Sequence, residues 1–172
     1  MRTVRSFAAG LFALLLMANA NAASLRPQAE NPAQALHSWY ALTLELIRHT
    51  ATYSPPVASR ALAYMGVTAW EATASGNPAL KSLAGQLNGF QALPPRESGK
   101  IYDETVVLHA ALEMSVKDFF WNTGPTGQRV YTAFAKALTA DAVKDKPADV
   151  VERSTVYGKL IAATVLEWSK TD

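Results

Sequence analysis

Hydrophobic positions recur every three or four residues along most of the chain, and this is the period of one face of a helix. The first such run covers residues 32–52 and follows Asn31, a residue type that commonly caps a helix. It begins with Pro32, and proline is favoured at the first helical position. No segment alternates polar and apolar residues over enough positions to predict a strand.

The same pattern predicts more helices further along. Residues 57–74 are rich in alanine and carry only two charges, Arg60 and Glu71, which predicts a helix surrounded by others. A short helix is expected within residues 78–87, followed by a loop over 88–99 that holds two prolines and two glycines. Long helices are expected over 101–119 and 150–168. Between them a further helix is expected after the turn at 122–127, with Thr123 or Thr126 available to cap it and an apolar stripe over 130–138. The prediction is an all-α bundle of about five main helices.

The first 22 residues have the features of a secretory signal peptide. Arg2 and Arg5 precede an apolar run from Phe7 to Ala18, and Ala-Asn-Ala then occurs twice in overlap before residue 23. The run of about twelve residues is short of the roughly 20 that span a membrane, so cleavage near Ala22 is favoured over an uncleaved anchor. We therefore expect one helical domain over 23–172, exported to the periplasm or the outside and without a stable membrane anchor.

Composition excludes several classes of function. The chain has 16 basic and 14 acidic residues, so 14 of each remain once Arg2 and Arg5 are removed with the leader. A balanced charge does not suit a nucleic-acid-binding protein, which needs a basic face. The absence of cysteine excludes disulfides, thiolate zinc sites and iron–sulfur clusters.

Two pairs of side chains are candidates for a metal site. Glu45 and His49 lie four residues apart on one predicted helix, and His109 and Glu113 lie four apart on another. Spacing of four places each pair on one helix face, and two such pairs on facing helices could bind a metal. Di-metal bundles use Glu and His three residues apart, however, so the alternative is two ordinary helix pairs. His37, the third histidine, is expected at the surface or at an interface.

Arg60 and Glu71 are candidates for structural contacts. They are eleven residues apart, hence on the same helix face and about 16 Å apart along its axis. On a central helix each would need its own buried partner, since an unpaired buried charge is costly. We expect them to tie helices together; the alternative is that they shape a ligand cavity.

The turn at 122–127 lacks the Gly-Lys-Ser or Gly-Lys-Thr ending of a phosphate loop, and no motif in the chain predicts an active site.

Several stretches resemble a known family. These are SPPVASRALAY (54–64), WEA (70–72), LAGQLN (83–88), FFWNTGPTG (119–127), YG (157–158) and WS (168–169). Together they resemble the N-terminal helices of bacterial vanadium-dependent haloperoxidases, which belong to the PAP2-type acid phosphatase superfamily. Members of the family commonly have Asp where Glu71 stands.

The resemblance implies a scaffold without the catalytic machinery. In the family an oxyanion, vanadate or phosphate, is held by a Lys…Arg-Pro segment, a Pro-Ser-Gly-His segment and a final Arg…His segment. The only Arg-Pro here is Arg26-Pro27, near the expected cleavage site, and Pro-Ser-Gly-His is absent. No catalytic residue is therefore carried over, and no cofactor is expected in this chain, whereas vanadate is expected for a full-length haloperoxidase.

The resulting hypothesis is an exported N-terminal helical scaffold whose partner is a missing catalytic half or a separate catalytic chain. With that partner it would oxidise halides with peroxide or hydrolyse phosphate esters, and alone it would do neither. The alternative is a free-standing periplasmic helical binding or partner protein, with the exposed apolar face of its last helix as an interface.

Overall fold

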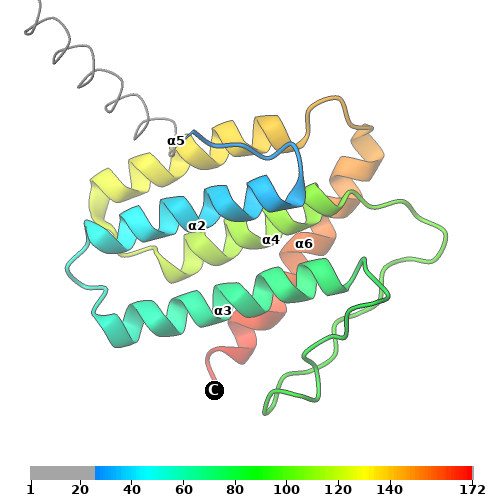
Figure 1. Cartoon of the computed structure of the whole chain (residues 1–172), viewed down its shortest axis with the longest axis horizontal. Helices are drawn as coiled ribbons and strands as arrows, with labels where there is room; N and C mark the ends of the chain where they lie inside the picture. Colours follow the sequence, from blue (N-terminus) through cyan, green and yellow to red (C-terminus); the bar gives the residue numbers. More distant parts are fainter. Residues whose placement is uncertain (1–25, 172) are drawn as a thin grey trace, which may run out of the picture.

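The computed structural model describes residues 26–171, which form an all-α bundle (Figure 1). Its helices are α2 (Pro32–Arg48), α3 (Pro55–Ala74), α4 (Glu104–Phe119), α5 (Gly124–Ala142) and α6 (Ala148–Trp168). No strand occurs within this range, so the predicted fold class is confirmed. The predicted signal peptide lies outside the described residues. Over residues 26–171, no helix combines the length and hydrophobicity needed to cross a membrane.

Helix α4 is the centre of the bundle. It packs against each of the other four helices, and every residue from Thr105 to Leu112 is buried. The prediction that the helix over 57–74 would be the surrounded one is wrong. Helix α3 lies at the edge of the bundle in Figure 1 and exposes Arg60, Ala63 and Trp70. The prediction inferred burial on all sides from the low number of charged residues. This inference fails because small uncharged residues can also face solvent.

Two helix starts follow the expected capping chemistry. The Asn31 side chain accepts a hydrogen bond from the backbone N–H of Gln34 at 3.0 Å, which confirms the predicted cap of α2. The Asp103 side chain does the same for α4 with the N–H of Val106 at 3.0 Å. Thr123 stands at the N-cap position of α5, but its hydroxyl donates to the carbonyl of Phe120 instead.

The segment between α3 and α4 contains turns and no helix, so the short helix expected within 78–87 is wrong. Its apolar residues instead pack on the middle of α3 and on the C-terminal end of α6. Phe90 is buried against Tyr64 and Val165, and its ring lies 5.1 Å from that of Trp168. The indole N–H of Trp168 also donates to the carbonyl of Asn88 at 2.9 Å. These contacts fasten the long loop to the bundle.

Candidate functional site

A buried aromatic and polar cluster joins α2, α4 and α5. Trp39 is fully buried, and its ring stacks on that of His109 with centroids 5.7 Å apart. Its indole Nε1 donates to His109 Nδ1 at 3.2 Å. On the other side of the imidazole, Nε2 lies 2.9 Å from the hydroxyl oxygen of Thr139.

These contacts define the protonation state of His109. An indole N–H can only donate, so Nδ1 must be the acceptor and a neutral ring carries its proton on Nε2. That proton is donated to Thr139, whose own hydroxyl donates to the carbonyl of Ala135 at 2.8 Å. Burial lowers the pKa of His109 to about 4, because desolvation disfavours the imidazolium. The ring is therefore a neutral structural group at ordinary pH.

The structure separates the two candidate metal pairs. His49 Nε2 lies 3.3 Å from a carboxylate oxygen of Glu45, and the His49 side chain is 70% exposed. His109 is 3% exposed, 3.8 Å from the Glu113 carboxylate, with both ring nitrogens already hydrogen-bonded. Burial raises the pKa of the Glu113 carboxyl, an effect that Lys159 and Lys117 oppose. Within residues 26–171, no three His, Asp or Glu side chains converge as metal ligands would.

Glu71 is a buried anchor for the long loop. Its side chain is 1% exposed, and its two carboxylate oxygens accept hydrogen bonds from the Ser82 hydroxyl at 2.8 Å and the Leu83 backbone N–H at 2.6 Å. Charge-assisted hydrogen bonds of this kind offset the cost of burying a carboxylate. The predicted buried partner is present, but it belongs to a loop and not to another helix.

Arg60 differs from its predicted role. It is exposed, so the expectation of a buried charge is wrong at this position. Its guanidinium donates to the carbonyl of Ser169 at 3.2 Å, just beyond the end of α6, and lies 5.4 Å from the ring centre of Tyr64. Arg60 therefore does link α3 to the end of α6, at the surface.

His37 is also exposed, in agreement with its predicted surface position.

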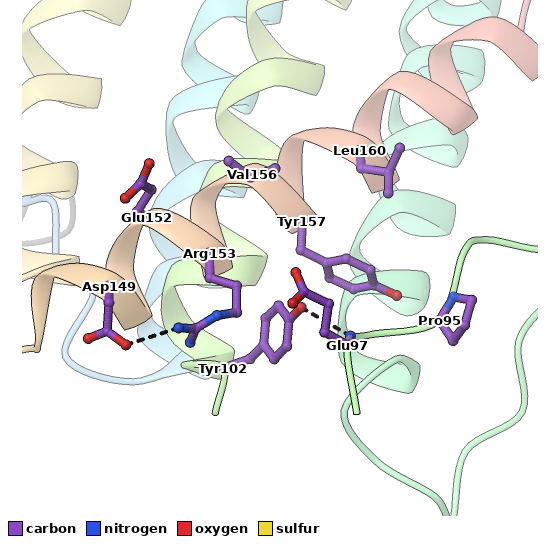
Figure 2. Close-up of a pocket in the computed structure, with 9 residues that line it drawn as sticks. All are labelled: Pro95, Glu97, Tyr102, Asp149, Glu152, Arg153, Val156, Tyr157 and Leu160. Atoms are coloured by element: carbon purple, nitrogen blue, oxygen red, sulfur yellow. Dashed lines mark hydrogen bonds and ion pairs between the residues drawn. The ribbon is translucent and has the colours of Figure 1, made fainter. Parts of the chain in front are cut away.

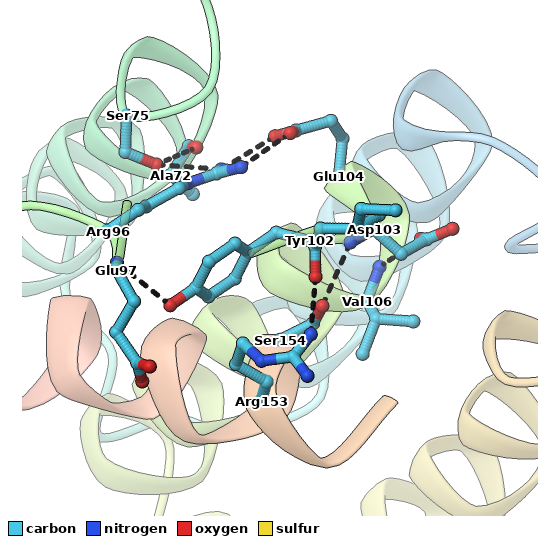
Figure 3. Close-up of polar contacts among 11 residues, drawn as sticks. Ala72, Ser75, Arg96, Glu97, Tyr102, Asp103, Glu104, Val106, Arg153 and Ser154 are labelled. Carbon is cyan, nitrogen blue, oxygen red and sulfur yellow. Dashed lines mark hydrogen bonds and ion pairs between the residues drawn. The ribbon is translucent and has the colours of Figure 1, made fainter. Parts of the chain in front are cut away.

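A second polar cluster, centred on Arg96, was not predicted (Figure 3). Arg96 binds both carboxylate oxygens of Glu104, at 2.6 and 2.7 Å, and donates to the Ser75 hydroxyl at 3.0 Å. Its guanidinium lies over the rings of Tyr102 and Tyr157, at 5.0 and 5.5 Å from their centres. One side chain thus connects the loop to α3, α4 and α6. No local pattern signals this, since two of its partners, Ser75 and Tyr157, come from distant parts of the chain.

The start of α4 is held at the same place. The backbone N–H of Asp103 donates to the buried Ser154 hydroxyl at 2.9 Å (Figure 3). The Asp103 carboxylate accepts a hydrogen bond from Lys146 Nζ at 2.7 Å. Asp103 therefore caps α4 and also binds α6 and the turn before it. These contacts fix the loop end relative to both helices.

Beside this cluster, a depression of about 470 Å³ opens between the loop and α6 (Figure 2). Tyr102 and Tyr157 lie in it, and Val156 and Leu160 continue it along α6. Arg153 binds Asp149 at 2.9 Å and the carbonyl of Ile101 at 2.6 Å.

The cations at these places already have partners. Arg96 is paired with Glu104, Arg153 with Asp149, and Lys146 with Asp103. A site for vanadate or phosphate needs several convergent donors whose charge is still available to the anion. The clusters around His109, Glu71 and Arg96 do not fit such an anion, and their contacts serve to join helices and loop.

No protein-family model matches the chain, and no curated protein sequence is significantly similar to it. A solved structure does match: the crystal structure of the first bacterial vanadium-dependent iodoperoxidase, at 28% sequence identity and a TM-score of 0.69. The fold is haloperoxidase-like. The match covers 81% of this chain and 32% of the iodoperoxidase chain, so the haloperoxidase-like helices span about a third of that neighbour's length.

Proposed function

We propose that this chain is the helical scaffold of an exported vanadium haloperoxidase-like protein, and that it has no catalytic activity by itself. The structural match to the iodoperoxidase carries this proposal, because it extends over most of the chain with detectable sequence identity. The scaffold provides a rigid helical bundle against which the catalytic half, or a separate catalytic chain, packs. The complete protein would oxidise halides with peroxide or hydrolyse phosphate esters.

The chemistry of the described residues supports the inactive state. Vanadate, when bound in a haloperoxidase, supplies the centre that activates peroxide, and it needs cationic donors around its oxygens. Arg96 and Arg153 are committed to carboxylates, and His109 has both nitrogens occupied. Within this proposal, the anion site is contributed by the catalytic half or by a separate catalytic chain.

Activity assays test the proposal directly. The purified chain is assayed for iodide and bromide oxidation with peroxide and vanadate, and for phosphatase activity with a chromogenic ester. A genuine vanadium haloperoxidase serves as the positive control. We expect no turnover above buffer and no saturable vanadate binding by vanadium NMR. Activity that copurifies with the chain and persists through a second chromatographic step would overturn the proposal.

Export is tested separately. The full coding sequence is expressed in a bacterium, and the protein is recovered from periplasm and cytoplasm. We expect periplasmic protein whose mass corresponds to a start at Ala23. Full-length protein confined to the cytoplasm would contradict the proposed export. It would not contradict the scaffold role, which the activity assays test.

A free-standing partner protein is the second candidate, and it is favoured by the exposed apolar side chains on α6. Val156 is 64% exposed and Leu160 is 38% exposed, which suits a surface that meets another protein. Size-exclusion chromatography and calorimetry separate the two candidates. A monomer with one cooperative thermal transition favours the free-standing protein, whereas aggregation and binding of a hydrophobic dye favour the scaffold.

A further inference from the structure

The outer face of α6 carries an apolar strip beside the long loop (Figure 2). Val156 and Leu160 are four residues apart, hence one turn apart on the same side of the helix, and both are exposed. Tyr157 and Pro95 continue the strip toward the loop. A strip with this spacing is complementary to the apolar side of a second helix.

Acidic side chains surround this strip. Glu97 on the loop and Glu152 on α6 line the depression, and neither carboxylate forms an ion pair within residues 26–171. A third carboxylate, that of Asp149, is balanced by Arg153 at 2.9 Å. The rim therefore carries two carboxylates that have no ion-pair partner in the described part of the chain.

The floor of this surface is held in place before any partner arrives. The Tyr157 hydroxyl donates to the carbonyl of Pro94 at 2.9 Å, and the Tyr102 hydroxyl accepts from the backbone N–H of Glu97 at 3.2 Å. Arg96 lies over both tyrosine rings. A surface that is already ordered loses little conformational entropy on binding, which favours affinity.

We propose that this face, formed by the outer side of α6 and loop residues 95–102, docks a basic amphipathic helix of a partner polypeptide. The partner's apolar side covers Val156 and Leu160, and its Lys or Arg side chains pair with Glu97 and Glu152. Charge complementarity selects a basic helix over an acidic one, because like charges opposed across the rim repel. The inference goes beyond the proposed function: it specifies the charge and the secondary structure of the bound segment, and it also holds for a free-standing partner protein.

Two synthetic peptides of roughly 18 residues, about five helical turns, serve as probes. Both carry the same leucine stripe; one has lysines on its polar side and the other has glutamates. Binding to the whole chain is measured by fluorescence anisotropy at low and at physiological salt. We expect saturable one-to-one binding of the lysine peptide that weakens with salt, and affinity at least about tenfold lower for the glutamate peptide.

Variants of exposed residues localise the binding. Combining Glu97→Gln with Glu152→Gln should weaken the lysine peptide about fivefold, the effect of two partly solvated charge pairs. Val156→Ser with Leu160→Ser should weaken it about tenfold. The control combines Glu30→Gln with Glu45→Gln, which removes the same charge from α2 and the segment before it, and should change the affinity less than twofold. Circular dichroism confirms that each variant is folded.

Three results of the binding measurements would overturn the proposal. They are the absence of saturable binding up to about 1 mM peptide, equal binding of the two peptides, and equal loss of affinity in the control variant. Amide NMR shifts give an independent measure, since the signals of Val156 and Leu160 should move on titration. Shifts confined to α2 and α3 would place the peptide on another face and contradict the assignment. None of these results depends on whether the chain takes part in halide oxidation.

Discussion

Gly158 on α6 lies directly against the backbone of Val107 on α4, close enough that a Cβ at position 158 would overlap the Val107 carbonyl oxygen. The Cβ of Ala110 would lie 3.0 Å from the added atom. Helices approach this closely only where a side chain is absent from the contact. The crossing of α6 over the central helix therefore depends on this glycine.

Gly158→Ala is expected to destabilise the chain by about 1–3 kcal/mol, because the opposing atoms are backbone and cannot move aside without shifting a helix. Urea unfolding followed by circular dichroism measures the change. Gly66→Ala is the matched control on α3, where the nearest atom to an added Cβ is the Tyr40 hydroxyl oxygen at 3.7 Å. The control should be neutral or more stable by up to about 1 kcal/mol, as expected for alanine in a helix. Equal effects at both positions would contradict the packing argument.

The buried His109 should make stability depend on pH. Its pKa is about 4 in the folded chain because burial disfavours the charged ring, against 6.5 for an exposed histidine. The unfolded chain binds the proton more readily, so this stabilisation is complete above pH 6.5 and is lost as the pH falls toward 4. Between pH 7 and pH 5 the loss is about 2 kcal/mol.

The control for this prediction is His109→Gln, which removes the titrating group and leaves His37 and His49 in place. The free energy of unfolding of both proteins should fall between pH 7 and pH 5. The fall should be about 2 kcal/mol smaller in the His109→Gln variant than in the wild type. If the free energies of unfolding of the two proteins changed equally with pH, His109 would not be buried and neutral as described.

Loss of the Glu71 charge should loosen the long loop. In Glu71→Gln the charged acceptor of the Leu83 N–H and the Ser82 hydroxyl is replaced by a neutral amide, at a cost of about 1–3 kcal/mol. Amide hydrogen exchange should accelerate at Leu83 and remain slow at Leu112 in the centre of α4. Glu45→Gln, at a surface ion pair on α2, should leave both rates unchanged.

Arg96→Lys keeps the charge and tests the geometry of the loop junction. Lysine cannot bind both oxygens of Glu104, nor can it lie flat over Tyr102 and Tyr157, so the loop should open more often. We expect limited proteolysis within residues 88–103 to be several times faster than in the wild type. Arg129→Lys, at an exposed site on α5, is the control and should be cleaved at the wild-type rate.

The two Glu–His pairs should not produce a metal site. Zinc at a fewfold excess is expected to leave the melting temperature unchanged, since His109 has no free nitrogen and the His49 pair is exposed. A stoichiometric metal found by elemental analysis, together with a melting temperature that rises with zinc and returns with chelator, would contradict this.

Local chemistry accounts for what the sequence predicted correctly. Helical periodicity, the Asn31 cap and the prolines at helix starts depend on residues within a few positions of each other, so the all-α class and most helix positions were readable. The long loop was harder, because turns in residues 78–87 are stabilised by contacts with α3 and α6 that have no local signature. The same limit applies to Arg96, whose partners Ser75 and Tyr157 are far away in the chain.

The sequence by itself determined that the chain forms helices and where most of them begin, since these properties follow from neighbouring residue types. Only the tertiary structure decided which helix is central, and it placed α4 there where composition favoured α3. It also decided that Glu71 is buried while Arg60 is exposed, although both share one helix. Burial depends on which surfaces meet in three dimensions, and that is a property of the whole packed bundle.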